Sequence, residues 1–300
     1  MSADTAVRPP SRAGTEVETA AEAEGFCEGA CELPVRGLRA GRPFARQDWV
    51  AEEVPVALEF NGISHAVMLA TPLDLEDFAL GFALSEGILD HGDELYAVDE
   101  EASEEGITLH LRIASAAFAR LKARRRSLAG RTGCGLCGTE SLSQVVRDVA
   151  PVNVAPRCEP GAIGRALAQL PALQTLQQAT GAAHAAAWCT AQGEVRWLRE
   201  DVGRHNALDK LIGALSRHDV PAAAGFVIVT SRASFEMVQK TASAGIGLLA
   251  AVSAPTALAI RTAQRCRLTL VGFARQQDLV IYNDPWRLAL DQPNGAGDAS

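Results

Sequence analysis

Cys134 and Cys137, separated by two residues, form the most reactive pattern in the sequence. They lie within Arg131-Thr-Gly-Cys-Gly-Leu-Cys-Gly-Thr-Glu-Ser-Leu142, where glycines flank both thiols. A thiol attacks as its thiolate, which is favoured by a nearby arginine, by backbone N–H groups that glycines leave accessible and by a following helix N-terminus. Ser141 begins a capping pattern, so such a helix is expected there. Two thiols at this spacing can exchange disulfides, bind a metal or accept a sulfur atom as persulfide.

The rest of the chain weakens two of these roles and leaves all three open. A structural zinc needs four ligands, usually from two such pairs, and the sequence has one Cys-x-x-Cys. A thioredoxin-like pair follows the first strand of a βαβ unit, whereas this pair follows a basic segment, 120–126. The zinc-deaminase pattern is also absent, since His184-Ala-Ala186 lacks the glutamate. These observations weaken a metal role without excluding it, and we expect no tightly held metal. Surrounding glycines favour a mobile segment, which a sulfur carrier needs to visit a donor and an acceptor.

Composition limits the class of protein. The chain has 300 residues and a net charge of −8, which does not favour nucleic acid or anionic membranes as partners. It has no run of 18 apolar residues and no N-terminal signal pattern. We expect a cytoplasmic protein, in which the cysteines stay reduced.

Hydrophobic periodicity predicts a hairpin first and an α/β alternation later. Strands at 54–60 and 63–69 flank Asn61-Gly62, a strong hairpin signal. Thr71 and Pro72 then predict the start of a helix that ends near Gly87. Further elements are expected as strands 95–98 and 107–113 around an acidic turn, helix 114–127, helix 161–169, strands 182–190 and 194–199, helix 202–217, strand 226–230, a helix from Ser234 to 243, strand 248–252, a helix from Pro255 to 266, and strands 268–273 and 279–282. Such alternation predicts helices on the faces of a sheet.

The chain divides into five expected parts. Residues 1–32 carry almost no large apolar side chain and are predicted to be a disordered tail. The others are a smaller α+β subdomain over 33–130, the Cys-x-x-Cys loop with its helix over 131–150, an α/β domain over 151–288 and a flexible tail over 289–300.

Two polar clusters follow predicted strands in the second half. Arg199-Glu-Asp-Val-Gly-Arg-His-Asn-Ala-Leu-Asp-Lys210 lies at a strand-to-helix turn, where α/β sheets place ligands. His205 at the helix start can donate to a phosphate; alternatively, Asp201 caps the helix while Arg204 and His205 face solvent. Ser231-Arg-Ala-Ser234 is a second such turn.

Four blocks of the sequence resemble the FdhD family of formate dehydrogenase accessory sulfurtransferases. They are 131–142, Arg199 to Gly213, Ser231-Arg-Ala-Ser-Phe-Glu-Met-Val-Gln-Lys240, and Ala254-Pro-Thr-Ala-Leu-Ala-Ile260 with Val271-Gly-Phe-Ala-Arg275. Together they cover the chain from about residue 35 to residue 288, and the blocks occur in the same order as in the family.

The resemblance implies a sulfur carrier. Such a protein takes persulfide sulfur from a cysteine desulfurase of the IscS type and passes it to the molybdenum cofactor in its bis-guanine-dinucleotide form. The sulfurated cofactor then enters the catalytic subunit of formate dehydrogenase, whose activity requires this step. The resemblance also implies a cytidine-deaminase-like α/β/α layer in the C-terminal domain and a homodimer.

The resemblance also assigns residues. Cys134 matches the persulfide-bearing cysteine and Cys137 its partner. The position that binds the guanine-dinucleotide cofactor matches Phe273, Ala274, Arg275, Gln276, Gln277 and Asp278. Candidates for holding its phosphates or guanine are Arg199, Arg204, His205, Ser231, Arg232 and Arg275. Two rival classes remain: a cofactor chaperone that does not handle sulfur, and a zinc-binding structural protein.

Overall fold

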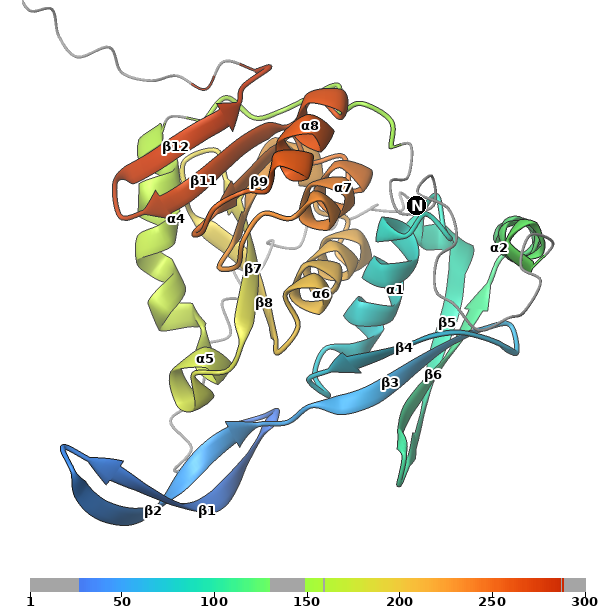
Figure 1. The fold of residues 1–300 in the computed structure, drawn as a ribbon. Helices are drawn as coiled ribbons and strands as arrows, with labels where there is room; N and C mark the ends of the chain where they lie inside the picture. Colours follow the sequence, from blue (N-terminus) through green and yellow to red (C-terminus); the bar gives the residue numbers. More distant parts are fainter. Residues whose placement is uncertain (1–26, 130–148, 159, 287, 289–300) are drawn as a thin grey trace, which may run out of the picture.

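The computed structural model of this chain describes residues 27–129, 149–158, 160–286 and 288. These residues form a mixed α/β protein with three sheets, of two, four and six strands (Figure 1). The α/β class is therefore as the sequence predicts. The cytidine-deaminase-like layering and the boundaries of the five expected parts stay predictions.

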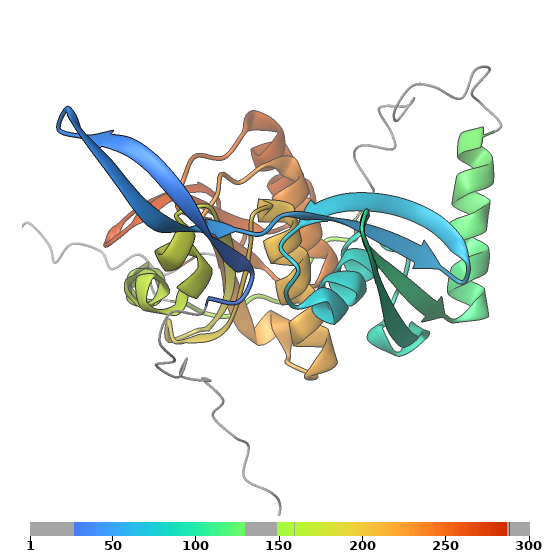
Figure 2. The ribbon, with the colours of Figure 1, turned by 90° about the horizontal axis from the view of Figure 1, so that it is seen from below.

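The two-stranded sheet is a hairpin that the sequence did not predict. β1 (Ala30–Arg39) pairs antiparallel with β2 (Arg42–Ala51) through a tight turn at Ala40 and Gly41, both of which have positive φ. The hairpin projects from the rest of the molecule (Figures 1 and 2). β1 begins inside the segment 1–32 that was expected to be disordered, while residues 1–26 lie outside the described part.

The four-stranded sheet contains the predicted Asn-Gly hairpin. β3 (Val54–Phe60) and β4 (Ile63–Ala70) are antiparallel and joined by Asn61 and Gly62, whose φ values of 45° and 81° suit the tight hairpin turn. β5 (Leu95–Ser103) pairs with β6 (Gly106–Ile113), and β6 is parallel to β3. The expected acidic turn over 99–105 is mostly strand, because β6 provides a hydrogen-bonding partner as far as Ser103.

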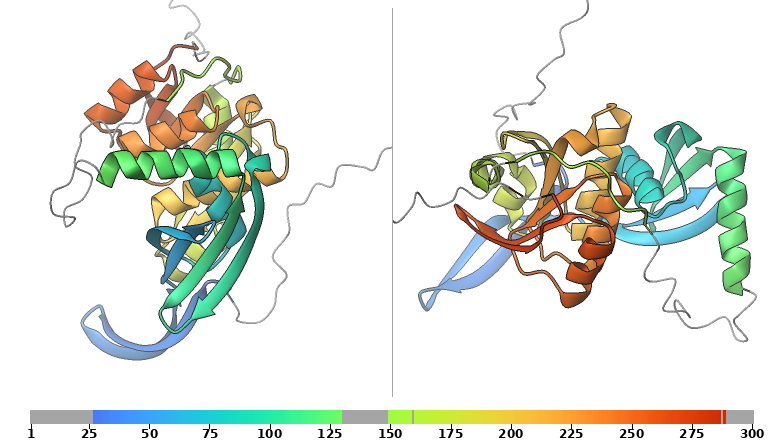
Figure 3. Two further views of the ribbon diagram at one scale, coloured as in Figure 1. Left: turned by 90° about the vertical axis from the view of Figure 1, so that its right-hand side faces the viewer. Right: turned by 90° about the horizontal axis from the view of Figure 1, so that it is seen from above.

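Helix α1 (Leu75–Ser85) packs on this sheet and starts later than predicted. Its N-cap is Asp74, in a left-handed conformation, rather than Thr71. The backbone of Thr71 is instead bound by residues from the second half of the chain, so it cannot open the helix. A short 3-10 turn, η1 (Gly92–Glu94), follows. α2 (Ser115–Ala129) lies at one end of the molecule, beyond the sheet (Figure 3).

The six-stranded sheet has the order β12-β11-β10-β9-β7-β8. Its strands are β7 (His184–Thr190), β8 (Val195–Asp201), β9 (Gly225–Val229), β10 (Leu248–Ala251), β11 (Thr269–Arg275) and β12 (Asp278–Asn283). β9, β10 and β11 are parallel neighbours, while β7 is antiparallel to both β8 and β9. β8, β9, β10 and β11 therefore point the same way.

Helices cover both faces of this sheet (Figure 1). One face carries α4 (Pro160–Leu173), and the other carries α6 (Arg204–Arg217), α7 (Phe235–Ser243) and α8 (Ala257–Arg265). α5 (Thr175–Thr180) and the 3-10 turn η2 (Ala222–Ala224) complete the described elements. α4 extends past its predicted end at Gln169 despite Pro171. No helix in the described ranges is long and apolar enough to cross a membrane.

Two glycines allow α1 and α6 to cross in backbone contact. A Cβ at Gly81 of α1 would lie 1.7 Å from the carbonyl oxygen of Asp209, and one at Gly213 of α6 would lie 1.9 Å from that of Asp77. Real Cβ atoms do not approach so closely, and the atoms that they would meet are backbone rather than flexible side chains. Glycine at both positions therefore joins the first half of the chain to the second.

Gly81→Ala should destabilise the protein by about 3 kcal/mol, because the added methyl group forces the two helices apart. Gly161→Ala is the matched control: in α4 its Cβ would meet the side chain of Arg165 at 3.2 Å, which can move. Urea unfolding measures both. A Gly81→Ala protein as stable as the control would show that the helices do not need this contact.

Candidate functional site

Strand-to-helix turns gather at one edge of the six-stranded sheet. Because β8, β9, β10 and β11 share a direction, their carboxyl ends meet at this edge, which we call the carboxyl edge. Three helices begin there: α6 after β8, α7 after β9 and α8 after β10. A helix N-terminus carries partial positive charge and unpaired N–H groups, so three of them favour an anion.

The carboxyl edge brings together most of the predicted ligand residues. Arg204 and His205 open α6, and Ser231 and Arg232 follow β9. The segment 273–278 forms the end of β11 and its turn into β12. Phe273 N donates to Ser253 O at 3.2 Å, which ties this segment to the turn after β10. Residues from three separate sequence blocks therefore lie at one edge.

Positive charge concentrates at this edge. His205 Nε2 lies 2.9 Å from Glu236 Oε2, which joins the starts of α6 and α7. The bond from His205 lowers the pKa of Glu236, which therefore stays ionised. Burial, together with the neighbouring Arg204 and His205, lowers the pKa of His184. Arg204 Nε and Ser234 Oγ are buried without a hydrogen-bond partner in the described part of the chain, and buried polar atoms of this kind normally have partners. An anionic ligand would supply them.

The residues of the segment 273–278 differ in exposure. Phe273 is 42% exposed, and both glutamines, Arg275 and Asp278 are exposed. Ala274 is buried in the core, so its side chain packs and only its backbone can meet a ligand. A groove of about 780 Å³ runs between this segment and α4. Its lining is mainly apolar and consists of Gly161, Gly164, Arg165, Leu167, Ala168, Pro171, Gln276 and Gln277.

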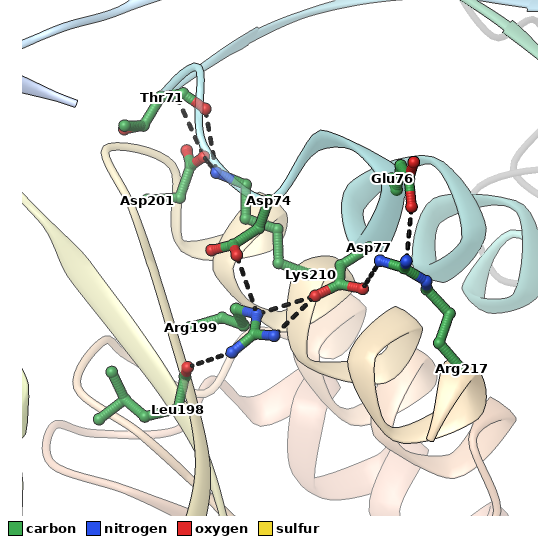
Figure 4. Close-up of polar contacts among 9 residues, drawn as sticks. All are labelled: Thr71, Asp74, Glu76, Asp77, Leu198, Arg199, Asp201, Lys210 and Arg217. Atoms are coloured by element: carbon green, nitrogen blue, oxygen red, sulfur yellow. Dashed lines mark hydrogen bonds and ion pairs between the residues drawn. The ribbon is translucent and has the colours of Figure 1, made fainter. Parts of the chain in front are cut away.

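Arg199 is the predicted ligand residue that the structure engages elsewhere. Its Nε and Nη2 donate to Asp77 Oδ2 of α1 at 2.9 and 2.8 Å, and Asp74 Oδ1 lies 3.4 Å from Nε (Figure 4). Arg217 donates to the other oxygen of Asp77. These contacts favour a role for Arg199 in joining α1 to β8 and α6.

Asp201 holds the turn before α6 in place. Its Oδ1 accepts hydrogen bonds from Gly203 N at 2.7 Å and from Asn206 Nδ2 at 3.0 Å. Its Oδ2 accepts from Thr71 N at 3.1 Å and from Lys210 Nζ at 2.7 Å. Both Asp201 and Lys210 are fully buried, and Lys210 also donates to Thr71 O (Figure 4). The alternative that Asp201 caps α6 is wrong, because the N-cap is Gly203 and no side chain caps this helix end; Asp201 holds the turn that precedes it.

A second buried cluster of charges joins the end of α1 to α6 and α7. Lys240 Nζ lies 3.0 Å from both oxygens of Asp209 and 2.7 Å from Glu86 Oε1. Burial alone would lower the pKa of Lys240, but Asp209 and Glu86 more than offset it, so the pKa is raised and the amine stays charged. Sequence reasoning missed these partners because they come from positions far apart in the chain.

Cys134 and Cys137 lie outside the described residues. The chain is described up to α2 and again from residue 149, so the cysteine segment connects the first half of the protein to the second. On α2, Arg120 Nη2 pairs with Asp90 and Glu94, which neutralise the first charge of the basic segment. Among the described residues, no cluster of three or more His, Cys, Asp and Glu side chains is arranged to hold a metal ion.

The fold and the carboxyl edge define an α/β protein suited to an anionic ligand, and comparison with known proteins supplies its family. The FdhD/NarQ family model matches residues 51–289, and the chain belongs to this family. It is 66% identical over 256 residues to the sulfur carrier protein FdhD of Variovorax paradoxus, covering 85% of this chain and 92% of the relative. It is 60% identical over 250 residues to the protein of that name from Cupriavidus necator, covering 83% and 87%.

A crystal structure from Desulfotalea psychrophila shares the fold. That protein, provisionally assigned as a formate dehydrogenase accessory protein, superimposes with a TM-score of 0.67 at 23% identity. The match covers 87% of this chain and 99% of the other.

Lys210→Met should lower the free energy of unfolding by about 3–5 kcal/mol, because it leaves the buried carboxylate of Asp201 without a counter-charge. Adding Asp201→Asn should recover part of this loss, since the unpaired charge is then removed. Lys122→Met is the control, because its amine lies over the ring of Phe118 without an ion pair among the described residues. Urea unfolding of the three variants measures the effect. If Lys210→Met were as stable as the control, the ion pair between Lys210 and Asp201 would contribute little to stability.

Proposed function

We propose that this protein is a sulfur carrier for formate dehydrogenase. It accepts sulfur from a cysteine desulfurase and transfers it to the bis-guanine-dinucleotide molybdenum cofactor before the cofactor enters the catalytic subunit. Membership of the FdhD/NarQ family and the names of its relatives support this proposal. One structural observation carries it: three helix N-termini and the predicted nucleotide residues share the carboxyl edge. A cytoplasmic location belongs to the same proposal.

The sulfur chemistry rests on Cys134 and Cys137. The thiolate of Cys134 attacks the outer sulfur of the desulfurase persulfide, the S–S bond breaks, and the desulfurase cysteine leaves as a thiolate. Cys134 then carries the persulfide. Cys137 as thiolate attacks the inner sulfur, which forms a Cys134–Cys137 disulfide and releases the outer sulfur as sulfide to the molybdenum. A cellular thiol reduces the disulfide afterwards.

The carboxyl edge binds the guanine-dinucleotide part of this substrate. Arg204 and Arg232 supply positive charge beside the N-termini of α6 and α7, His205 can donate a hydrogen bond there, and Arg275 adds charge from the β11–β12 turn. The exposed amides of Gln276 and Gln277 can pair with the edge of the guanine, next to the apolar groove along α4. Arg199 contributes indirectly, through its hold on α1.

Two architectural features belong to the same proposal. The α/β/α arrangement of the six-stranded sheet supports a cytidine-deaminase-like fold for the C-terminal domain. A homodimer is the proposed assembly, as the family resemblance implies.

Incubation with a cysteine desulfurase and cysteine should add sulfur to the protein, about 32 Da per atom, at Cys134. Intact-protein and peptide mass spectrometry detect it. Cys134→Ala should accept none, whereas Cys158→Ala, which removes a buried thiol whose pKa burial raises to about 11, should accept sulfur normally. Full loading of Cys134→Ala would show that Cys134 is not the acceptor.

The double variant Cys134→Ala/Cys137→Ala separates a carrier from a cofactor chaperone. It should abolish maturation of formate dehydrogenase and leave nucleotide binding intact. Unimpaired maturation would favour the chaperone, and stoichiometric zinc by elemental analysis would favour the structural zinc protein.

Arg232→Ala and Arg275→Ala should each weaken binding of GDP, a fragment of the substrate, about tenfold, because each removes a charge-assisted contact with phosphate. Calorimetric titration measures the affinity. Arg196→Ala is the control: it removes an exposed arginine at the start of β8, away from the carboxyl edge. Equal affinities for all three variants would place the nucleotide elsewhere.

A further inference from the structure

The β1–β2 hairpin, which we call the arm, has no core of its own. None of residues 30–51 is buried. Leu33, Leu38 and Val50 are 46%, 71% and 40% exposed. An isolated two-stranded hairpin is marginally stable in water, because it orders many residues and buries little. The arm therefore requires a surface to cover it, and its main contact with another described element is with the short helix α5.

The charge on the arm indicates what kind of surface this is. Between Leu33 and Gln47 the arm carries four arginines and no acidic residue, in a chain of net charge −8. The four are Arg36, Arg39, Arg42 and Arg46. Arg46 pairs with Asp48, and the other three have no ion pair among the described residues. The covering surface should therefore be acidic and offer some apolar contact.

The same chain presents such a surface at the β5–β6 hairpin. Five exposed acidic residues gather there, with no lysine or arginine between Leu95 and His110. They are Asp99, Glu100, Glu101, Glu104 and Glu105. β5 is an edge strand of its sheet, and Tyr96 on it is 66% exposed. Arm and acidic hairpin project from the molecule at separate places (Figures 1 and 2).

We propose that the arm of each copy docks on the acidic β5–β6 hairpin of a second copy, in a reciprocal exchange. The inference rests on the proposed homodimer and assigns its contact surface.

The area that the arm can bury favours a reciprocal arrangement. A ribbon of ten-residue strands is about 33 Å long and about 10 Å wide, so one face covers about 330 Å². One arm on an unrelated partner buries about 660 Å² in total, below the size of a stable interface. Two reciprocal arms bury about 1,300 Å², which reaches it.

Charge reversal on either surface should weaken self-association. The arm variant is Arg36→Glu/Arg39→Glu/Arg42→Glu, and the hairpin variant is Glu100→Lys/Glu104→Lys/Glu105→Lys. Glu101 is left unchanged because it pairs with His110. Each variant should raise the dimer dissociation constant at least about tenfold, since every contact occurs twice in a reciprocal dimer. Sedimentation of the full-length chain measures this constant, and circular dichroism verifies folding. Charge reversal at the exposed Arg196 of β8 and Arg261 of α8, which belong to neither surface, is the control and should change nothing.

Mixing the two variants is the decisive experiment. The acidic arm of one then meets the basic hairpin of the other, and the one remaining arm–hairpin pair keeps its native charges, so a heterodimer should form at near wild-type strength. An arm variant that dimerises as tightly as the wild-type chain would overturn the assigned surface and leave the dimer standing. Two weakened variants that fail to associate when mixed would overturn the pairing of arm with hairpin. A wild-type chain that is monomeric at all concentrations would overturn the dimer as well, whereas the sulfur-carrier proposal is judged separately by the persulfide measurement.

Discussion

The buried carboxylate of Asp201 is the contact on which the arrangement of the described chain depends. One oxygen shapes the turn into α6, and the other accepts from Thr71 N and from the buried amine of Lys210. A buried carboxylate with four donors, one of which carries the opposite charge, is tolerated, whereas the same group without its counter-charge is strongly destabilising. The start of α6 and the end of β4 are therefore fixed relative to each other.

The helix crossing reinforces this constraint. Gly81 and Gly213 allow backbone contact between α1 and α6, and a close crossing brings the side chains beside it within ion-pairing distance. Asp77 of α1 pairs with two arginines from the second half, and Glu86 pairs with Lys240 of α7. Because these charges are paired between the first and second halves of the chain, the two halves cannot separate without breaking the ion pairs. The carboxyl edge and the helix that leads to the cysteine segment thus belong to one framework.

Local patterns predicted most elements of this fold, and long-range contacts explain what they missed. The Asn61-Gly62 hairpin and the later strand–helix alternation depend on neighbouring residues, and their positions are confirmed within a few residues. Arg199 looked like a phosphate ligand because its partner, Asp77, is 122 residues away. Thr71 looked like a helix cap because its backbone partners, Asp201 and Lys210, are also far away in the sequence. β1 and β2 escaped prediction because nothing in the described chain buries them, so no apolar periodicity marks them.

Net charge and local charge act at different ranges in this protein. A net charge of −8 repels polyanions at a distance, but screening limits this repulsion to about 8 Å at physiological salt. At the carboxyl edge, the helix N-termini, Arg204 and Arg232 would act on an anion at contact distance, where desolvation strengthens the attraction. Glu236 stays ionised beside His205 and so moderates the positive charge of this edge. An acidic protein can therefore bind a compact anion that fits this edge and still discriminate against extended polyanions, whose remaining charges would face its acidic surface.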